Sequence, residues 1–125
     1  MSAKNKEIFK KADAAFAEGN IDGFLSFCAD DVVWTIVGDR TVKGKNAIRE
    51  WMASMDMEPP TFTVHNVIAE GDLLTSNGDM TMKDKQGKVV PYSYCDIYKF
   101  RDEKIVELTS FVVRTEAKSE ASSGA

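Results

Sequence analysis

The segment of this chain that is most informative about its fold is Tyr94-Cys95-Asp96-Ile97-Tyr98-Lys99-Phe100. The pattern predicts a β-strand, on which successive side chains point to opposite faces. Asp96 then shares one face with Tyr94 and Tyr98, and this aromatic-rich face is the one that we expect to be interior. A carboxylate there is costly unless it is hydrogen-bonded, paired or protonated. Asp96 is therefore the candidate functional residue, and the alternative is a hydrogen bond that only fixes the core.

Extended segments surround this one, and helical segments precede them. We expect strands at Val32–Val37 and near Thr61–Glu70, Leu73–Lys83, Val89–Arg101 and Lys104–Arg114. The last four are joined by short turns, which favours antiparallel neighbours. Apolar residues at helical spacing predict three helices through Ile8, Ala12, Ala15 and Phe16, through Ile21, Phe24, Leu25 and Cys28, and through Ile48, Trp51, Met52 and Met55. This order predicts an α+β domain with helices on one face of a curved, mostly antiparallel sheet.

Composition narrows the possible partners and compartments. The chain has 125 residues, 43% hydrophobic content and a net charge of −4, which suits one domain over residues 1–115, and its polar end, 116–125, is expected to be disordered. No basic patch favours nucleic acid, and no apolar run favours a membrane. There is no leader-like start and no cysteine framework, so a cytoplasmic location is expected. His65 has no partner at metal-ligand spacing, so we expect no metal site. We also expect no cofactor.

Three segments of the sequence carry a resemblance to a known family. They are Gly19-Asn20-Ile21-Asp22-Gly23-Phe24-Leu25 with the following Ala29-Asp30-Asp31-Val32-Val33-Trp34, then Val42-Lys43-Gly44-Lys45-Asn46-Ala47-Ile48, and then Asp96-Ile97-Tyr98-Lys99-Phe100-Arg101-Asp102-Glu103-Lys104-Ile105. In this order and spacing the chain resembles the NTF2-like superfamily, in particular its SnoaL-like and ketosteroid-isomerase-like branch, over roughly residues 5 to 114. The resemblance implies a cone-shaped fold around a pocket. Members include isomerases, cyclases, hydrolases and non-enzymatic binding modules, so the fold alone leaves the function open.

Strand parity within such a cone predicts the pocket lining. The expected catalytic residue is Asp96, as acid/base or hydrogen-bond donor. The expected ligand-binding residues are Trp34, Ile36, Met80, Met82, Tyr94, Tyr98, Leu108 and Ser110. They form a largely apolar set with few polar groups, as is usual for a small-molecule site. The expected ligand is a small apolar or carbonyl-containing molecule.

The family's catalytic roles are only partly matched. Its steroid isomerases use a protonated acid, a base and a tyrosine, and the corresponding positions here are Asp96, Ile36 and Ala12. Its cyclases add a histidine where this chain has Met80 and Met82. The resemblance thus implies either an isomerase, cyclase or hydrolase that depends on Asp96, or a binding module without catalysis.

The outer sheet face suggests a further possibility. Ile97, Thr109, Phe111 and Val113 are expected on the side without helices. An exposed apolar sheet face usually marks an interface, and family relatives often dimerise there. We therefore expect a homodimer through this face, and an interaction module that uses it is the third functional alternative.

Overall fold

The computed structural model describes residues 2–55 and 58–115, and the tail for which disorder is expected lies outside these residues. Its elements, in chain order, are α1 (Ser2–Ala17), α2 (Ile21–Leu25), β1 (Cys28–Ile36), β2 (Arg40–Lys43), α3 (Lys45–Met55), β3 (Thr61–Glu70), β4 (Leu73–Lys83), β5 (Val89–Arg101) and β6 (Lys104–Arg114). The last four strands have the bounds expected from the sequence. No helix in the described part of the chain is long and apolar enough to cross a membrane.

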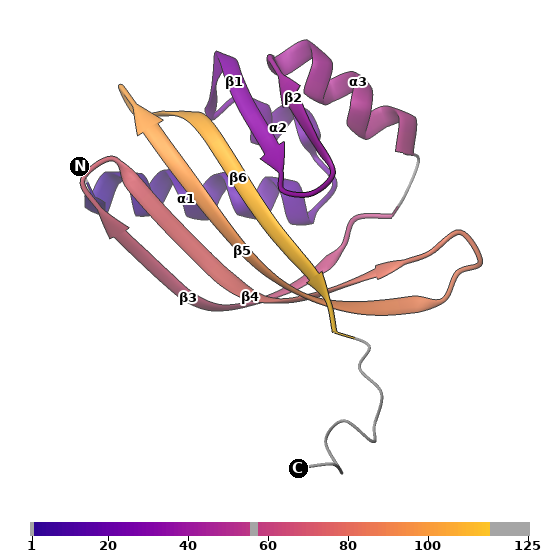
Figure 1. Cartoon of the computed structure of the whole chain (residues 1–125). Coiled ribbons are helices and arrows are strands. Elements are labelled where there is room, and N and C mark those ends of the chain that lie inside the picture. Colours follow the sequence, from indigo (N-terminus) through magenta and orange to yellow (C-terminus); the bar gives the residue numbers. More distant parts are fainter. Residues whose placement is uncertain (1, 56–57, 116–125) are drawn as a thin grey trace.

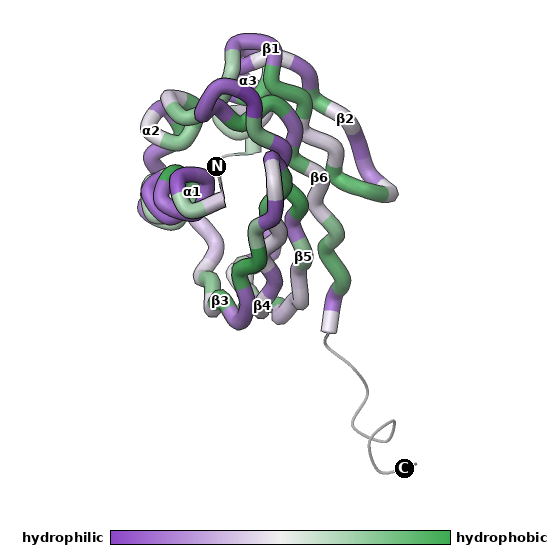
Figure 2. The backbone as a smooth tube through the Cα atoms, turned by 90° about the vertical axis from the view of Figure 1, so that its left-hand side faces the viewer, coloured by the Kyte–Doolittle hydropathy of each residue, from purple (hydrophilic) through white to green (hydrophobic). Residues whose placement is uncertain are grey.

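A single curved sheet forms the body of the fold. The strand order is β2-β1-β6-β5-β4-β3. Neighbours are antiparallel except β1 and β6, which run parallel. The helices lie on one side of the sheet, and α1 runs across its concave face (Figures 1 and 2). This arrangement confirms the expected α+β cone.

A tight corner sets the angle between the first two helices. Gly19 has a φ of 79°, a left-handed conformation that glycine adopts at little cost, and it ends α1. The Asn20 side chain then caps α2 by accepting a hydrogen bond of 2.9 Å from the Gly23 amide. The corner brings the rings of Phe16 and Phe24 to 5.5 Å between centroids. Aromatic side chains of both helices therefore meet over the sheet.

Three local expectations differ from the structure. Strand β1 spans Cys28–Ile36, so it begins earlier than the expected Val32–Val37 and ends one residue sooner. Helix α2 ends at Leu25, so Cys28 does not extend its apolar stripe but begins β1. The Ser26 hydroxyl donates to the Gly23 carbonyl oxygen at 2.6 Å, which satisfies a helix-end carbonyl and closes the helix early. Strand β2 was not expected, because it is short and mostly exposed and so lacks the apolar alternation of an interior strand.

The central strands bury alternate residues as parity predicts. On β4 the buried side chains include Leu74, Ser76 and Met80, and on β6 they include Leu108 and Ser110. Leu74 and Leu108 belong to one hydrophobic core, which joins the helices to the sheet. Its members are Ile8, Phe9, Ala12, Phe24, Leu25, Cys28, Val32, Trp34, Ile48, Leu74, Tyr98, Phe100, Ile105 and Leu108. Each large aliphatic side chain buried in this way contributes about 1.5–3 kcal/mol. The concave face of the sheet is therefore the inside of the molecule.

The turn between β5 and β6 is strained. Asp102 has a φ of 53° and Glu103 a φ of 63°, so both adopt the left-handed conformation. The two-residue hairpin needs this geometry to match the twist of its strands. Aspartate tolerates it better than glutamate does. Glu103 therefore carries a conformational cost that glycine would not.

Replacing Glu103 with glycine should stabilise the protein by about 0.5–1 kcal/mol, because the left-handed conformation costs glycine little. Urea unfolding of the purified variant measures the change. Glu103→Ala is the matched control, since it removes the carboxylate but keeps the Cβ. Alanine should leave the free energy of unfolding close to that of the natural chain. Equal stabilisation by alanine and glycine would show that charge, not backbone strain, is the cause.

Candidate functional site

Three polar side chains form a row across the concave face. Ser76 on β4 is paired with Asp96 on β5, and Asp96 is paired with Ser110 on β6. Ser76 is 1% exposed and Ser110 4% exposed. Because paired residues of neighbouring strands point to the same face, the Asp96 carboxylate lies between the two serines. The register thus creates a polar patch inside an otherwise apolar surface.

A hydrogen-bond chain connects this row to the first strand. Trp34 on β1 is 8% exposed, and its indole Nε1 donates to the Ser110 Oγ at 2.9 Å. The Ser110 hydroxyl is hydrogen-bonded in turn to Asp96 and acts to lower the pKa of that carboxyl. The parallel pairing of β1 with β6 brings Trp34 beside Leu108, two residues from Ser110. Trp34 therefore orients the serine that contacts the candidate acid.

Asp96 and Ser110 of this row line a large cavity. The cavity has a volume of about 1010 Å³. Five aromatic residues, each from a different element, contribute to its walls: Phe16, Trp34, Trp51, Phe62 and Tyr94. Their rings contact one another in sequence, with Trp34 and Trp51 at 5.2 Å and Phe62 and Tyr94 at 5.5 Å between centroids. Such a volume and lining suit a small organic ligand.

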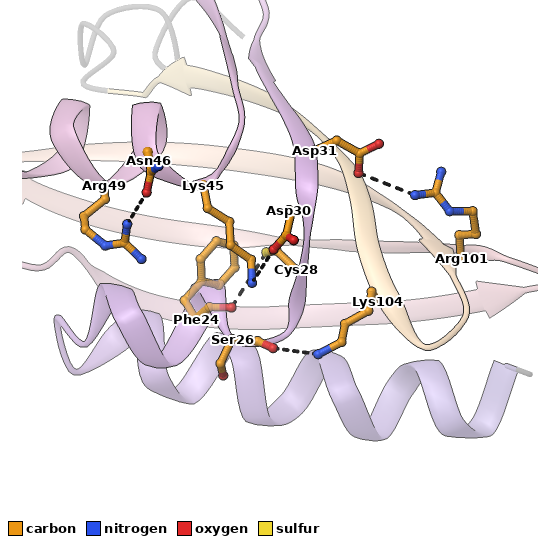
Figure 3. Close-up of polar contacts among 10 residues, drawn as sticks. All are labelled: Phe24, Ser26, Cys28, Asp30, Asp31, Lys45, Asn46, Arg49, Arg101 and Lys104. Carbon is orange, nitrogen blue, oxygen red and sulfur yellow. Dashed lines mark hydrogen bonds and ion pairs between the residues drawn. The ribbon is translucent and has the colours of Figure 1, made fainter.

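Charged side chains gather at the ends of the helices and on the loop after β1. The Arg49 Nε donates to the Asp22 Oδ1 at 2.7 Å, and its Nη1 donates to the Asn46 Oδ1 at 2.8 Å, the contact drawn in Figure 3. The Arg40 guanidinium lies 5.4 Å from the centroid of the Trp51 ring and pairs with Asp39. These contacts occupy both arginines. The cavity lining is thus charged near these segments, and around Asp96 it is aromatic and aliphatic apart from Ser110.

Burial is the main influence on the acid. It raises the pKa of Asp96 to about 7, against the hydrogen bond from Ser110, and the negative charge of Asp13 raises it further. Burial also raises the pKa of Tyr94 and that of Tyr98, so both phenols keep their protons near neutral pH. A carboxyl that titrates near pH 7 can accept or donate a proton there. Asp96 therefore meets the electrostatic requirement for acid/base work.

Asp13 on α1 is a second acid that sequence reasoning missed. Burial raises its pKa too. It lies between Phe9, whose ring contacts Tyr98 at 5.3 Å, and Phe16, whose ring contacts Phe62 at 6.0 Å. Asp13 is four residues after Phe9 and three before Phe16, which is the spacing of one helix face. That spacing is the sequence signal for this position, but the more strongly apolar stripe through Ile8 and Ala12 marks a neighbouring face of the helix as the buried one.

The structure brings most of the expected ligand-binding residues together. Six of them line the cavity with Asp96: Trp34, Ile36, Met80, Met82, Tyr94 and Ser110. Tyr98 and Leu108 lie deeper, in the hydrophobic core, and are not part of the lining. His65 is exposed and is not part of the cavity lining. Its Nε2 lies 2.9 Å from the Asp79 carboxylate. Within residues 2–55 and 58–115, no three potential metal-ligating side chains form a group.

Polar contacts at the start of β1 have a structural role. In Figure 3, Lys104 donates to the Ser26 carbonyl oxygen at 2.9 Å, and Asp31 pairs with Arg101 at 3.4 Å. Cys28 donates to the Phe24 carbonyl oxygen at 3.7 Å. Burial raises the pKa of its thiol to about 12, which makes it unreactive. A smaller hollow of about 310 Å³ beside Asp31 and Arg101 is lined by charges of both signs.

Replacing Asp96 with asparagine should remove the loss of stability that the natural chain suffers as the pH rises. The raised pKa of Asp96, about 7 in the folded protein, means that folding favours the protonated form. The stabilisation by this group is complete below about pH 4 and is lost as the pH rises through about 7. The free energy of unfolding of Asp96→Asn, relative to that of the natural chain, should therefore be roughly 2–4 kcal/mol higher at pH 8 than at pH 4.

Urea unfolding at both pH values measures that gain. Asp79→Asn is the matched control, because Asp79 lies on the neighbouring strand and is exposed, and its pKa is lowered by hydrogen bonds from His65 and Ser93. That variant should show no gain at the higher pH. An equal stability difference for Asp96→Asn at both pH values would mean that the Asp96 carboxylate is solvated.

Comparison with known proteins agrees with this architecture. A family model described as the SnoaL-like domain matches residues 10–108. A search of curated proteins gives no match. An NTF2-like protein of unknown function from Cytophaga hutchinsonii is similar at 27% identity, with a TM-score of 0.71, over 86% of this chain and 97% of that one.

Two further solved structures share the fold at lower identity. TerC, co-crystallised with polyporic acid, has 20% identity and a TM-score of 0.76 over 86% of this chain and 89% of its own. An NTF2-like protein of unknown function from Burkholderia pseudomallei has 17% identity and a TM-score of 0.79 over 88% and 90%. The family match covers most of the domain, and the fold agrees with it. The chain belongs to the SnoaL-like domain family and has the NTF2-like fold.

Proposed function

We propose that this protein binds a small, largely apolar cyclic or carbonyl-containing molecule in its large cavity, and that Asp96 exchanges a proton with that molecule. One observation carries the proposal: a carboxyl whose pKa is raised to about 7 is present on the wall of an aromatic-lined cavity. Proton transfer is most efficient when the pKa of the acid or base is close to the working pH. The corresponding reaction class is isomerase-like or cyclase-like.

The contacts of Asp96 define what it would do. In its ionised form it takes a proton from a carbon next to a ligand carbonyl, and in its protonated form it returns the proton to another atom. Ser110 and Trp34 hold the carboxylate in place through their hydrogen-bond chain. Ile36 lines the cavity at the position that resembles the base of the steroid isomerases. A single carboxyl must therefore serve as both base and acid, and a hydrolase would use it to activate water.

Binding without catalysis is the alternative function. The side chain of Ile36 cannot transfer a proton, and Ala12 offers no phenol. A cavity with one polar anchor holds a ligand without changing it. TerC, which shares the fold, was co-crystallised with polyporic acid. An interaction module with a filled interior is less favoured here, because the cavity of about 1010 Å³ is not filled by Trp34, Met80 and Met82.

Proton exchange from cyclic ketones tests the catalytic role without knowledge of the natural substrate. The protein should speed deuterium incorporation next to the carbonyl of such ketones in D2O, measured by NMR. The rate should rise with pH through about 7, the pKa of Asp96, because the ionised form is the base. Asp96→Asn should lower the catalysed rate by about 10²- to 10⁴-fold, whereas Asp79→Asn should keep it.

Asp13→Asn adds a second readout to this experiment. Because the charge of Asp13 raises the pKa of Asp96, its removal should move the midpoint of the pH profile to lower pH. A purely structural role for Asp13 would change the rate at all pH values and leave the midpoint in place. Ketones that bind but exchange no faster than in buffer would favour the non-catalytic alternative.

We also propose that the protein forms a homodimer through the outer face of β5 and β6. Ile97, Phe111 and Val113 are 38%, 42% and 63% exposed there, on the side of the sheet opposite the helices. Phe111→Glu should convert the dimer to a monomer in sedimentation at tens of micromolar, since a charge would be buried in the interface. Val37→Glu, at an exposed apolar residue of the cavity lining, should leave the dimer intact. A natural chain that sediments as a monomer would contradict the proposal.

A further inference from the structure

The lining of the large cavity carries more acidic than basic residues. Among its described residues, five are acidic and one is basic: Glu18, Asp22, Asp39, Glu58 and Asp96, against Arg49. The Arg49 guanidinium is already engaged by the Asp22 carboxylate and by the Asn46 side chain. An anionic ligand would therefore meet repulsion without a free cation to receive it.

The basic residues next to the cavity do not neutralise the excess of acidic side chains around Asp96. Arg40 pairs with Asp39 at 3.4 Å, and Lys83 pairs with Glu58 at 3.2 Å. Both pairs are exposed, so solvent and salt weaken their fields. In the described part of the chain, no Lys, Arg or His forms an ion pair with Asp96. The groups that act on its charge are Asp13 from α1 and Ser110 from β6, and its own charge acts in turn on Tyr94 and Tyr98 from β5.

The aromatic walls also favour positive charge. The faces of indole, phenol and phenyl rings are negative and attract cations within about 6 Å. Five such rings come from α1, β1, α3, β3 and β5. Trp51 already shows this behaviour, since the Arg40 guanidinium lies 5.4 Å from the centroid of its ring. Aromatic rings around a carboxylate form a recognised type of site for ammonium groups.

We propose that the cavity selects ligands with a quaternary or protonated nitrogen over neutral and anionic molecules of the same shape. The positive nitrogen lies among the aromatic rings and near the Asp96 carboxylate. This inference rests on the small-molecule site proposed above and names its ligand class. It also fits the proton-transfer role, because removal of a proton from the ligand creates negative charge, and no free cation of the cavity lining is placed to offset it. A ligand that brings its own positive charge offsets it instead.

Three probes of nearly one shape separate charge from fit. Benzyltrimethylammonium carries a permanent positive charge, neopentylbenzene is its neutral carbon isostere, and phenylacetate carries a negative charge. The chain has two tryptophans, Trp34 and Trp51, and both line the cavity. Intrinsic fluorescence therefore reports occupancy directly. Because the ammonium probe does not titrate, any pH dependence of its binding comes from the protein.

The ammonium probe should bind about ten times more tightly than neopentylbenzene at pH 8, a ratio typical of a cation among aromatic rings beside a carboxylate. The ratio should fall several-fold at pH 5.5, where Asp96 holds its proton. Asp96→Asn should remove this pH dependence and most of the preference, while neopentylbenzene should bind that variant as well as it binds the natural chain. Asp79→Asn, which removes one exposed charge outside the cavity, should keep both.

Three results would contradict the inference, and they differ in what else they exclude. If neopentylbenzene or phenylacetate binds as tightly as the ammonium probe, the preference for cations is wrong and the small-molecule site remains. If none of the three probes changes the tryptophan fluorescence or gives binding heat at millimolar concentration, both the ligand class and the site for small apolar molecules are contradicted. A preference that survives unchanged in Asp96→Asn would assign it to the outer acids and contradict the role given to Asp96.

Discussion

The partly buried position of the Asp96 carboxylate on the concave face of the sheet is the constraint on which the site depends. Moving a charged group out of water is costly, and the cost appears as a pKa raised to about 7. The fold reduces this cost only in part, through a hydrogen bond from Ser110 to Asp96. Trp34 orients Ser110, because its indole Nε1 donates to the Ser110 Oγ at 2.9 Å. A fully paired carboxylate would be more stable but would have no reason to exchange its proton near neutral pH. The proposed proton exchange relies on this incomplete compensation, because it leaves the pKa of Asp96 near neutral pH.

The connection between strand pairing and chemistry explains why the site needs the whole sheet. The polar row exists because β4, β5 and β6 pair in a register that aligns Ser76, Asp96 and Ser110. The Trp34 contact exists because β1 returns parallel to β6. A slip of one residue in any of these pairs would turn the whole side-chain set to the other face. The helices then complete the cavity with aromatic residues from α1 and α3.

The sequence predicted the parts of this fold that depend on local pattern. Strong alternation placed Asp96, Ser110 and Trp34 on the interior face, and the bounds of β3 to β6 followed from turns and alternation. Strand β2 has little apolar signal, and the end of α2 depends on the hydrogen bonds of one serine. The position of Asp13 depends on how α1 rotates against the sheet. Propensity and period do not determine that rotation, because it results from packing between distant segments.

The charge balance of the cavity, like the position of Asp13, depends on contacts between segments that are distant in the sequence. Four acids of the lining lie outside the strands, in the turns, connections and short helix around them: Glu18, Asp22, Asp39 and Glu58. Only the folded chain brings them around one space with Asp96 of β5. The arginines that could neutralise that space are held by Asp22, Asn46 and Asp39. The interior therefore holds one carboxylate among aromatic faces and no free cation in its described lining. In the proposed site, the charge of the ligand therefore decides binding before any proton is transferred, because the acids and the ring faces of the lining all attract positive charge.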